Sequence, residues 1–308
     1  MKTSAVFTRE QDGFRGYLYP AAAETDRCML VVLGDEGNDF LSTAFARWLT
    51  RTQGCYALCI ALRQDRSEDT GIHGWPLDRI ETAMEKMKAL GMKKLGLLGM
   101  SMQGAMALTA ASLIPGFSLV VAFTPCDFVP WGFYQGRIGK EAHGEWPSGG
   151  SAFSWRGREL PFQPAGQEKD AYWQMFCDAK KEFKEMHSRT IFEFSEQQHP
   201  ISEDCFIPVE NIGGRLVLIG TEDDSMWASS RYIRRMEDRL ARFGKSADTL
   251  VYPFGTHLLT PDSLLKLALP LVGGIVPRMF RSGKAHPKEC TQARLDVDKR
   301  LTRIFRQW

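Results

Sequence analysis

Two kinds of segment alternate along the chain. Short, almost wholly apolar runs bounded by turn residues predict buried strands. These runs occupy residues 28–34, 55–62, 94–99, 118–124, 215–220 and 248–254. Segments whose apolar positions recur at helical spacing lie between them and predict helices at residues 40–54, 76–91, 102–114 and 229–243. Strands that alternate with helices form parallel βαβ units, so the sequence predicts an α/β fold, a mostly parallel sheet flanked by helices.

Two segments depart from this alternation. Residues 6–10 and 13–21 are expected to form a hairpin at the edge of the sheet. Residues 127–193 are rich in aromatic side chains and turn formers without the alternation of strands, and they include Trp146 and Trp155. This pattern predicts an inserted cap over the strand ends, within a single domain that spans residues 1–308, with both tryptophans binding substrate. The alternative is an insertion whose aromatics form its own small core.

The composition argues against several classes of function. The chain has 308 residues, 44% of them hydrophobic, and a formal net charge of only +2, which gives no indication of nucleic-acid binding. No run approaches the roughly 18 apolar residues of a membrane span, and the first residues lack the apolar core of a signal peptide. Seven cysteines without C-x-x-C spacing favour a reduced, cytoplasmic protein. The sequence contains no metal-binding motif, and no cofactor is expected.

The stretch LGLLGMSMQGAMAL at residues 95–108 places Ser101 between a predicted strand and a predicted helix. That is the context of a nucleophile elbow, G-x-S-x-G, in which small residues relieve crowding at a sharp turn. Gly99 fits the pattern, but Gln103 stands where glycine is expected and Gly104 follows one place late. The sequence therefore predicts an elbow in which the side chain of Gln103 turns outward.

Two further signals follow Ser101 in order. Acidic residues in GTEDDSMW come directly after one predicted strand, and His257 in YPFGTHLL comes directly after the last. Serine, acid and histidine at successive strand ends is the chain order of the α/β-hydrolase triad, in which histidine takes the serine proton and the acid orients the imidazole. Counting from the strand-ending Gly220 favours Asp223 as the acid.

An oxyanion hole requires two backbone N–H groups directed at the developing negative charge. The residue after the nucleophile, Met102, is expected to supply one. The second is expected from the loop after the first parallel strand, LGDEGND, and hence from Asp35 or Glu36. Acidic side chains beside an oxyanion are unfavourable unless they point away from it.

The sequence resembles the C-terminal catalytic domain shared by acyl-CoA thioesterases and bile acid-CoA:amino acid N-acyltransferases. The resemblance rests on GMSMQGA, PVENIGGRLVLIGTEDDSMWAS, YPFGTHLL and GGSAFSWRGRELPF. It implies an α/β-hydrolase fold and an acyl thioester substrate. In the family pattern the aspartate stands three residues before a tryptophan, which selects Asp224 before Trp227. A serine nucleophile in this family accompanies hydrolysis, whereas a cysteine accompanies transfer to amines.

Residues 278–306 contain nine lysine or arginine residues and three acidic residues. Val297, Leu301, Ile304, Phe305 and Trp308 fall on one helical face, which is expected to dock on the body of the protein. The basic face is expected to be solvated, and the alternative is contact with coenzyme A phosphates.

Three interpretations of function follow from the sequence. The first is a serine hydrolase of acyl thioesters that acts through a triad of Ser101, Asp224 and His257. The second is a carboxylesterase or peptidase of the same fold, because the triad itself does not select the leaving group. The third is a catalytically silent binding protein, which Gln103 and the acidic oxyanion loop favour.

Overall fold

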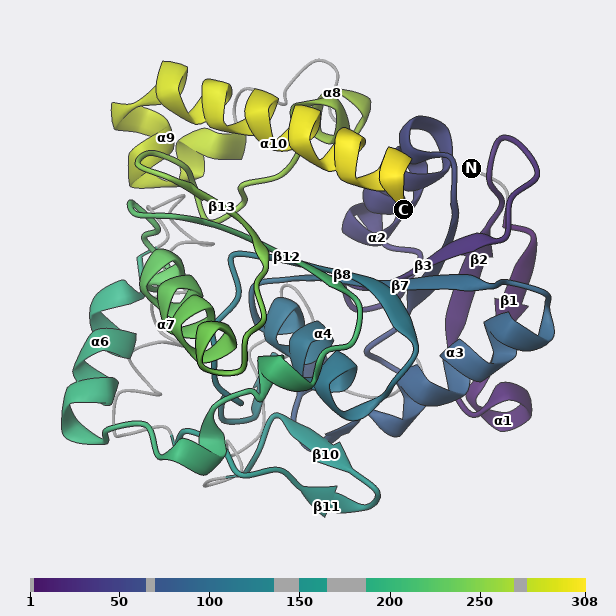
Figure 1. Ribbon diagram of the computed structural model, residues 1–308, viewed down its shortest axis with the longest axis horizontal. Helices are drawn as coiled ribbons and strands as arrows, with labels where there is room; N and C mark the ends of the chain where they lie inside the picture. Colours follow the sequence, from purple (N-terminus) through teal and green to yellow (C-terminus); the bar gives the residue numbers. More distant parts are fainter. Residues whose placement is uncertain (1–2, 65–69, 136–149, 165–186, 269–275) are drawn as a thin grey trace.

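The computed structural model describes residues 3–64, 70–135, 150–164, 187–268 and 276–308. In this part of the chain the apolar runs form one eight-stranded sheet with the order β1-β2-β4-β3-β7-β8-β12-β13 (Figure 1). Its strands are β1 (Ala5–Phe7), β2 (Gly16–Tyr19), β3 (Arg27–Val32), β4 (Tyr56–Ile60), β7 (Lys94–Met100), β8 (Phe117–Phe123), β12 (Arg215–Thr221) and β13 (Asp248–Tyr252). Pairing is parallel from β4 to β13, and β1 and β2 form an antiparallel edge. The predicted α/β fold is therefore confirmed.

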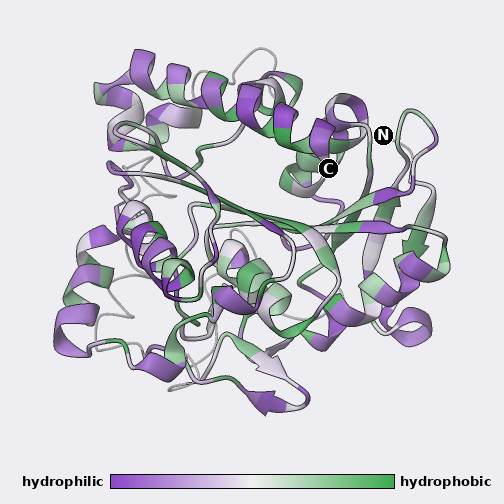
Figure 2. Cartoon of the chain, viewed as in Figure 1, coloured by the Kyte–Doolittle hydropathy of each residue, from purple (hydrophilic) through white to green (hydrophobic). Residues whose placement is uncertain are grey.

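Helices cover both faces of the sheet (Figure 1). One face carries α3 (Asp78–Ala89), α4 (Met102–Leu113) and α7 (Ser229–Arg242), and the other carries α2 (Phe40–Trp48), α8 (Asp262–Ala268) and α10 (Pro287–Gln307). Each set buries its apolar side chains in a separate core, and Figure 2 shows the strands between them as mainly hydrophobic. As expected, the apolar face of α10 is buried in the second core. The helical covering on both faces explains why the central strands are almost wholly apolar.

Two helices differ in detail from the sequence expectation. Pro76 lies in a short strand, β6 (Trp75–Pro76), and α3 begins at Asp78. After α2 the chain continues through a π-helical turn, Leu49–Gln53, and stops at Gly54, whose φ of 65° is left-handed. That conformation suits glycine, so the predicted helix end is where the sequence placed it.

The order of the strands determines where a site can form. The chain adds β4 on one side of β3 and then returns to add β7 on the other. Loops that follow β3 and β7 therefore diverge at this point of the sheet, and a crevice between them is the usual ligand position in an open α/β sheet. The loop after β3 contains Asp35, and the turn after β7 contains Ser101.

The segment predicted as a cap, 127–193, lies in the chain between β8 and β12. Contrary to expectation, it contains strands: β9 (Phe133–Gln135) pairs with β5 (Thr70–Ile72), and β10 (Phe153–Trp155) pairs with both β6 and β11 (Arg158–Glu159). The turn between β10 and β11 has positive φ at Arg156 and Gly157, which marks a tight hairpin turn. The turn formers in this stretch therefore specify a hairpin. The single-domain and cap assignments stay predictions.

The remaining described elements are short, apart from α6. They are α1 (Arg9–Asp12), α6 (Arg189–Gln198), α9 (Arg281–Ala285), and the 3-10 turns Glu203–Cys205, Val209–Asn211 and Val276–Met279.

Candidate active site

Ser101 occupies a sharp turn between β7 and α4. Its φ of 58° and ψ of −128° lie in a region that residues other than glycine rarely adopt, and such strain tends to occur at functional sites. The Ser101 N–H donates to Phe123 O over 2.8 Å, which ties the turn to the end of β8. The side chain is only partly buried. The chain therefore presents the Ser101 hydroxyl at the carboxyl end of β7 and beside the first turn of α4.

The elbow is tightest at Gly99. A Cβ on Gly99 would lie 2.0 Å from the Gln103 carbonyl oxygen and 2.5 Å from its carbonyl carbon. A Cβ on Gly104 would face β8 instead, 3.2 Å from Phe123 O and 3.3 Å from Pro125 Cβ. The strand therefore meets the backbone of Gln103 and not its side chain, so glutamine at this position is compatible with the turn.

His257 bridges Ser101 and Asp224. Its Nε2 lies 2.8 Å from Ser101 Oγ, and its Nδ1 lies 2.9 and 3.0 Å from the two carboxylate oxygens of Asp224. Both His257 and Asp224 are buried, at 5% and 1% exposure. The Met226 N–H also donates to Asp224 Oδ1 over 2.9 Å, so the carboxylate is fixed on two sides. In this arrangement the Nε2 lone pair faces the hydroxyl.

The other two acids of the turn are not part of this chain of hydrogen bonds. Glu222 pairs with Arg234 and accepts a hydrogen bond from Ser230 Oγ. Asp223 is partly exposed and makes no hydrogen bond to His257. Of the three candidates in the sequence, the structure therefore brings Asp224 to the histidine.

Two supporting residues were not assigned a role from the sequence. Thr124 Oγ1 donates to His257 O over 2.9 Å, and Trp227 Nε1 donates to Thr124 O over 3.0 Å. The Trp227 ring also lies edge-on to the imidazole, with 5.2 Å between ring centroids. Trp227 was visible as part of the Asp-x-x-Trp pattern, whereas nothing in the sequence around Thr124 indicated its contact with a residue 133 positions away.

The contacts of the loop after β3 distinguish Asp35 from Glu36 as the second oxyanion donor. The Glu36 N–H donates to Asp39 Oδ2 over 3.0 Å, so it is already engaged and is a poor second donor. Among the described residues, neither the Asp35 N–H nor the Met102 N–H has a hydrogen-bond acceptor. Unpaired N–H groups are typical of the first turn of a helix such as α4. The pair that remains available is Met102 and Asp35.

The acidic side chains of this loop differ in how far their charge is compensated. Glu36 forms ion pairs with Arg15 at 3.0 Å and with Arg63 at 2.6 Å. Burial, together with the nearby carboxylates of Asp39 and Glu36, raises the pKa of Asp35 to about 6. The Asp35 side chain is therefore more readily protonated than an ordinary aspartate.

The two predicted substrate-binding tryptophans are not brought together by the described residues. Trp146 lies outside them. Trp155 lies in β10, where the Arg156 guanidinium covers its ring at 4.3 Å, and Arg156 in turn pairs with Asp78 and Glu81. These contacts attach the hairpin to α3. A role for Trp155 in substrate binding stays a prediction.

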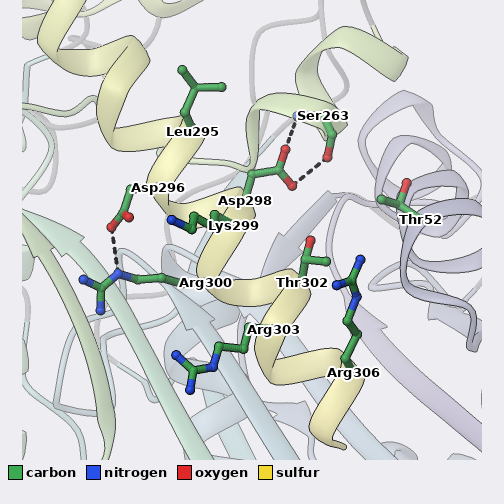
Figure 3. Close-up of a pocket in the computed structure, with 10 residues that line it drawn as sticks. All are labelled: Thr52, Ser263, Leu295, Asp296, Asp298, Lys299, Arg300, Thr302, Arg303 and Arg306. Carbon is green, nitrogen blue, oxygen red and sulfur yellow. Dashed lines mark hydrogen bonds and ion pairs between the residues drawn. The ribbon is translucent and has the colours of Figure 1, made fainter.

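A groove of about 830 Å³ runs along α10, and its lining contains four cations together with Asp296, which pairs with Arg300, and Asp298 (Figure 3). The last residue of this helix, Trp308, contacts the starts of two strands: its carbonyl accepts from Lys94 Nζ and its Nε1 donates to Ser118 Oγ. Lys94 begins β7, whereas Ser101 follows the end of that strand, roughly 20 Å away at about 3.3 Å per residue. The basic end of the groove, at Arg303 and Arg306, is therefore at the opposite edge of the sheet from Ser101.

Other site types find no support in the described part of the chain. No group of three or more histidine, cysteine, aspartate or glutamate side chains there could hold a metal ion. None of the helices in the described ranges is both long and apolar enough to span a membrane.

Comparisons with known proteins identify the family and the fold. Residues 81–264, more than half of the chain, match the family model described as BAAT / Acyl-CoA thioester hydrolase C terminal. An α/β-hydrolase enzyme from a Medee basin deep-sea metagenome library superposes with a TM-score of 0.53 at 13% identity, covering 100% of this chain and 99% of the other. An esterase from Pyrococcus furiosus gives a TM-score of 0.49 at 12% identity, with coverage of 100% and 97%. A search of curated proteins found no matching sequence.

The family match spans the elbow, the acid turn and the histidine loop, and the metagenomic enzyme shares the fold over the whole length of the chain. The resemblance noted from the sequence is therefore confirmed. The chain belongs to the BAAT / acyl-CoA thioester hydrolase C-terminal family and is a hydrolase of the α/β-hydrolase fold.

Proposed function

We propose that this hydrolase cleaves acyl thioesters through an acyl-serine intermediate on Ser101. The observation that carries the proposal is the continuous chain of hydrogen bonds from Ser101 Oγ through His257 to Asp224, with contacts of 2.8 and 2.9 Å. A serine is a weak nucleophile until a neighbouring base accepts its proton. The thioester substrate class rests on the family to which the chain belongs.

The reaction follows from these positions. Ser101 Oγ attacks the thioester carbonyl while His257 Nε2 accepts its proton, and Asp224 stabilises the imidazolium that forms. The N–H groups of Met102 and Asp35 stabilise the oxyanion. His257 then returns the proton to the departing thiolate sulfur. In the second half-reaction His257 removes a proton from water as the water oxygen attacks the acyl-serine carbonyl. His257 then returns that proton to Ser101 Oγ as the carbon–oxygen bond breaks, and the free acid leaves with Ser101 restored.

Water is expected to be the acceptor in the second step. An acyl-serine is an oxygen ester and reacts less readily with amines than a thioester does. We therefore expect free acid as the main product even with glycine present at high concentration. The variant Ser101→Cys tests whether the nucleophile decides this outcome, because some amide should then form.

The decisive experiment combines labelling with turnover. Wild type should react with a fluorophosphonate probe and release thiol from acyl-CoA, and Ser101→Ala and His257→Ala should do neither. A matched oxygen ester separates the thioesterase assignment from a general carboxylesterase, which would prefer the ester. A folded wild type that neither reacts with the probe nor turns over would favour a silent binding protein and overturn the proposal.

A further inference from the structure

The turn that carries Asp224 is held from outside by two residues at the start of α6. The backbone N–H of Ser188 and the backbone N–H of Arg189 each donate a hydrogen bond to Ser225 O over 3.0 Å. Ser188 Oγ donates to Met226 O over 2.6 Å. The Arg189 guanidinium donates through Nη1 to Glu222 O over 2.8 Å and to Asp224 O over 3.4 Å.

These contacts matter because the turn has little regular structure of its own. The segment between β12 and α7 runs from residue 222 to residue 228 and contains neither helix nor strand. Backbone carbonyls that are buried without partners are costly, and here four carbonyls of the turn accept hydrogen bonds from Ser188 and Arg189. Arg189 is itself oriented by an ion pair of 2.8 Å to Glu193, one turn further along α6.

A second contact from the same helix reaches the histidine side of the site. Phe192 is buried and packs edge-on against Trp227, with 5.3 Å between ring centroids. Trp227 in turn packs edge-on against the His257 imidazole at 5.2 Å. α6 therefore contacts the residues that hold both Asp224 and His257, although it precedes them in the sequence by more than 30 positions.

We propose that Arg189 is a positioning residue that keeps the Asp224 turn in register with His257; this inference rests on the proposed triad chemistry. In the described part of the chain Arg189 makes no hydrogen bond to Ser101 or to the His257 ring; its partners are Glu193 and the carbonyls of the turn. Its Nη1 donates to two carbonyls of the turn, so its loss frees the backbone that carries the carboxylate. A misplacement of about 1 Å at a catalytic group lowers turnover by about 100-fold, and KM depends on other residues.

The test compares Arg189→Ala and Arg189→Lys with the matched control Arg231→Ala. Arg231, on α7, also ties α6 to the body of the protein, through an ion pair of 2.9 Å to Glu196, and among the described residues it makes no hydrogen bond or ion pair with the Asp224 turn. We expect Arg189→Ala to lower kcat on an acyl-CoA by about 10- to 100-fold with KM within about twofold, and Arg189→Lys to recover part of it. The acid limb of the pH–rate profile should move to lower pH, since a less well placed carboxylate stabilises the imidazolium less. Arg231→Ala should keep wild-type kcat and pH profile.

A proton NMR measurement makes the outcome independent of turnover. The His257 Nδ1–H that donates to Asp224 should give a low-field signal in wild type and in Arg231→Ala, and that signal should weaken or shift in Arg189→Ala. Unchanged kcat, pH profile and NMR signal in folded Arg189→Ala would overturn the inference, as would equal changes in Arg231→Ala. If Arg189→Ala does not fold, Arg189→Lys decides by the same criteria. Failure of the proposed function would appear differently, as an inactive and unlabelled wild type that still shows the signal.

Discussion

Replacing Asp224 with asparagine removes the charge from the proposed triad acid and keeps its shape. Both carboxylate oxygens lie within 3.0 Å of His257 Nδ1, and Oδ1 also accepts the Met226 N–H. Because the Met226 N–H requires an acceptor, the asparagine amide is expected to place its oxygen at Oδ1 and its NH₂ group at the position of Oδ2. That NH₂ group faces Nδ1 and favours the tautomer with the proton on Nε2.

The consequence is a base that can no longer accept a proton. Nε2 lies 2.8 Å from Ser101 Oγ, so a proton there occupies the position that must receive the serine proton. The imidazolium also loses the charge that stabilises it. Turnover should fall by about 10⁴-fold, which corresponds to about 5 kcal/mol in the activation barrier.

The control is Asp223→Asn, the same substitution one residue earlier in the same turn. Asp223 makes no hydrogen bond to His257, so its variant should keep turnover within about twofold of wild type. The side chain is partly exposed, so the free energy of unfolding should change by no more than about 0.5 kcal/mol. The assay is thiol release from an acyl-CoA at saturating substrate, with thermal melts to show that both variants fold. Retention of more than a tenth of the activity by Asp224→Asn, or a larger loss in Asp223→Asn, would refute the reasoning.

Three further predictions concern the elbow, the oxyanion loop and the insertion. In urea unfolding, Gly99→Ala should cost at least about 1–3 kcal/mol and more than Gly104→Ala, because its Cβ would overlap backbone and the other would not; equal costs would contradict this. Burial raises the pKa of Asp35 to about 6. Between about pH 4 and 6 the folded state therefore holds a proton on Asp35 that the unfolded state has lost, and the free energy of unfolding falls as pH rises through that window. Unfolding at pH 4.5 and 7 should show that Asp35→Asn removes this fall of at most about 3 kcal/mol. Trp155→Ala should change the ratio of rates on short and long acyl chains, whereas an unchanged ratio with a lower Tm would assign the ring to packing.

Much of the fold could be predicted because its signals are local. An apolar run such as residues 94–99 is buried on both faces of a parallel sheet wherever its neighbours come from, so the run alone indicates a strand. The elbow at Ser101 and the position of His257 are local in the same way, since each follows directly from a strand end. The choice between Asp223 and Asp224 was not local. It depends on which carboxylate the turn directs toward His257: counting from Gly220 favoured Asp223, the family pattern selected Asp224, and Asp224 is the one that lies against His257 Nδ1.

Other parts of the site depend on contacts between distant segments. The Arg189 guanidinium reaches a turn more than 30 residues away, and no periodicity or motif around it indicates that contact. The hairpin at Phe153–Trp155 was missed for a related reason. Its strands have only three and two residues, too short for an alternating pattern, and β10 is held by pairing with β6 from another part of the chain.

The acidic loop after β3 was the strongest argument in the sequence for a silent protein, and the contacts of its three acids weaken that argument. Glu36 is neutralised by Arg15 and Arg63. Asp39 accepts N–H groups from Glu36 and Ser42 and caps α2, so its charge is directed toward donors of its own loop and the positive end of that helix. The remaining carboxyl, on Asp35, has a raised pKa and is therefore more readily protonated than an ordinary aspartate. An oxyanion at Met102 and Asp35 would therefore meet backbone N–H groups, and in the described part of the chain Asp35 is the one acid of this loop with neither an ion pair nor a capping contact, so the count of three acids in LGDEGND overstates the uncompensated charge at the site.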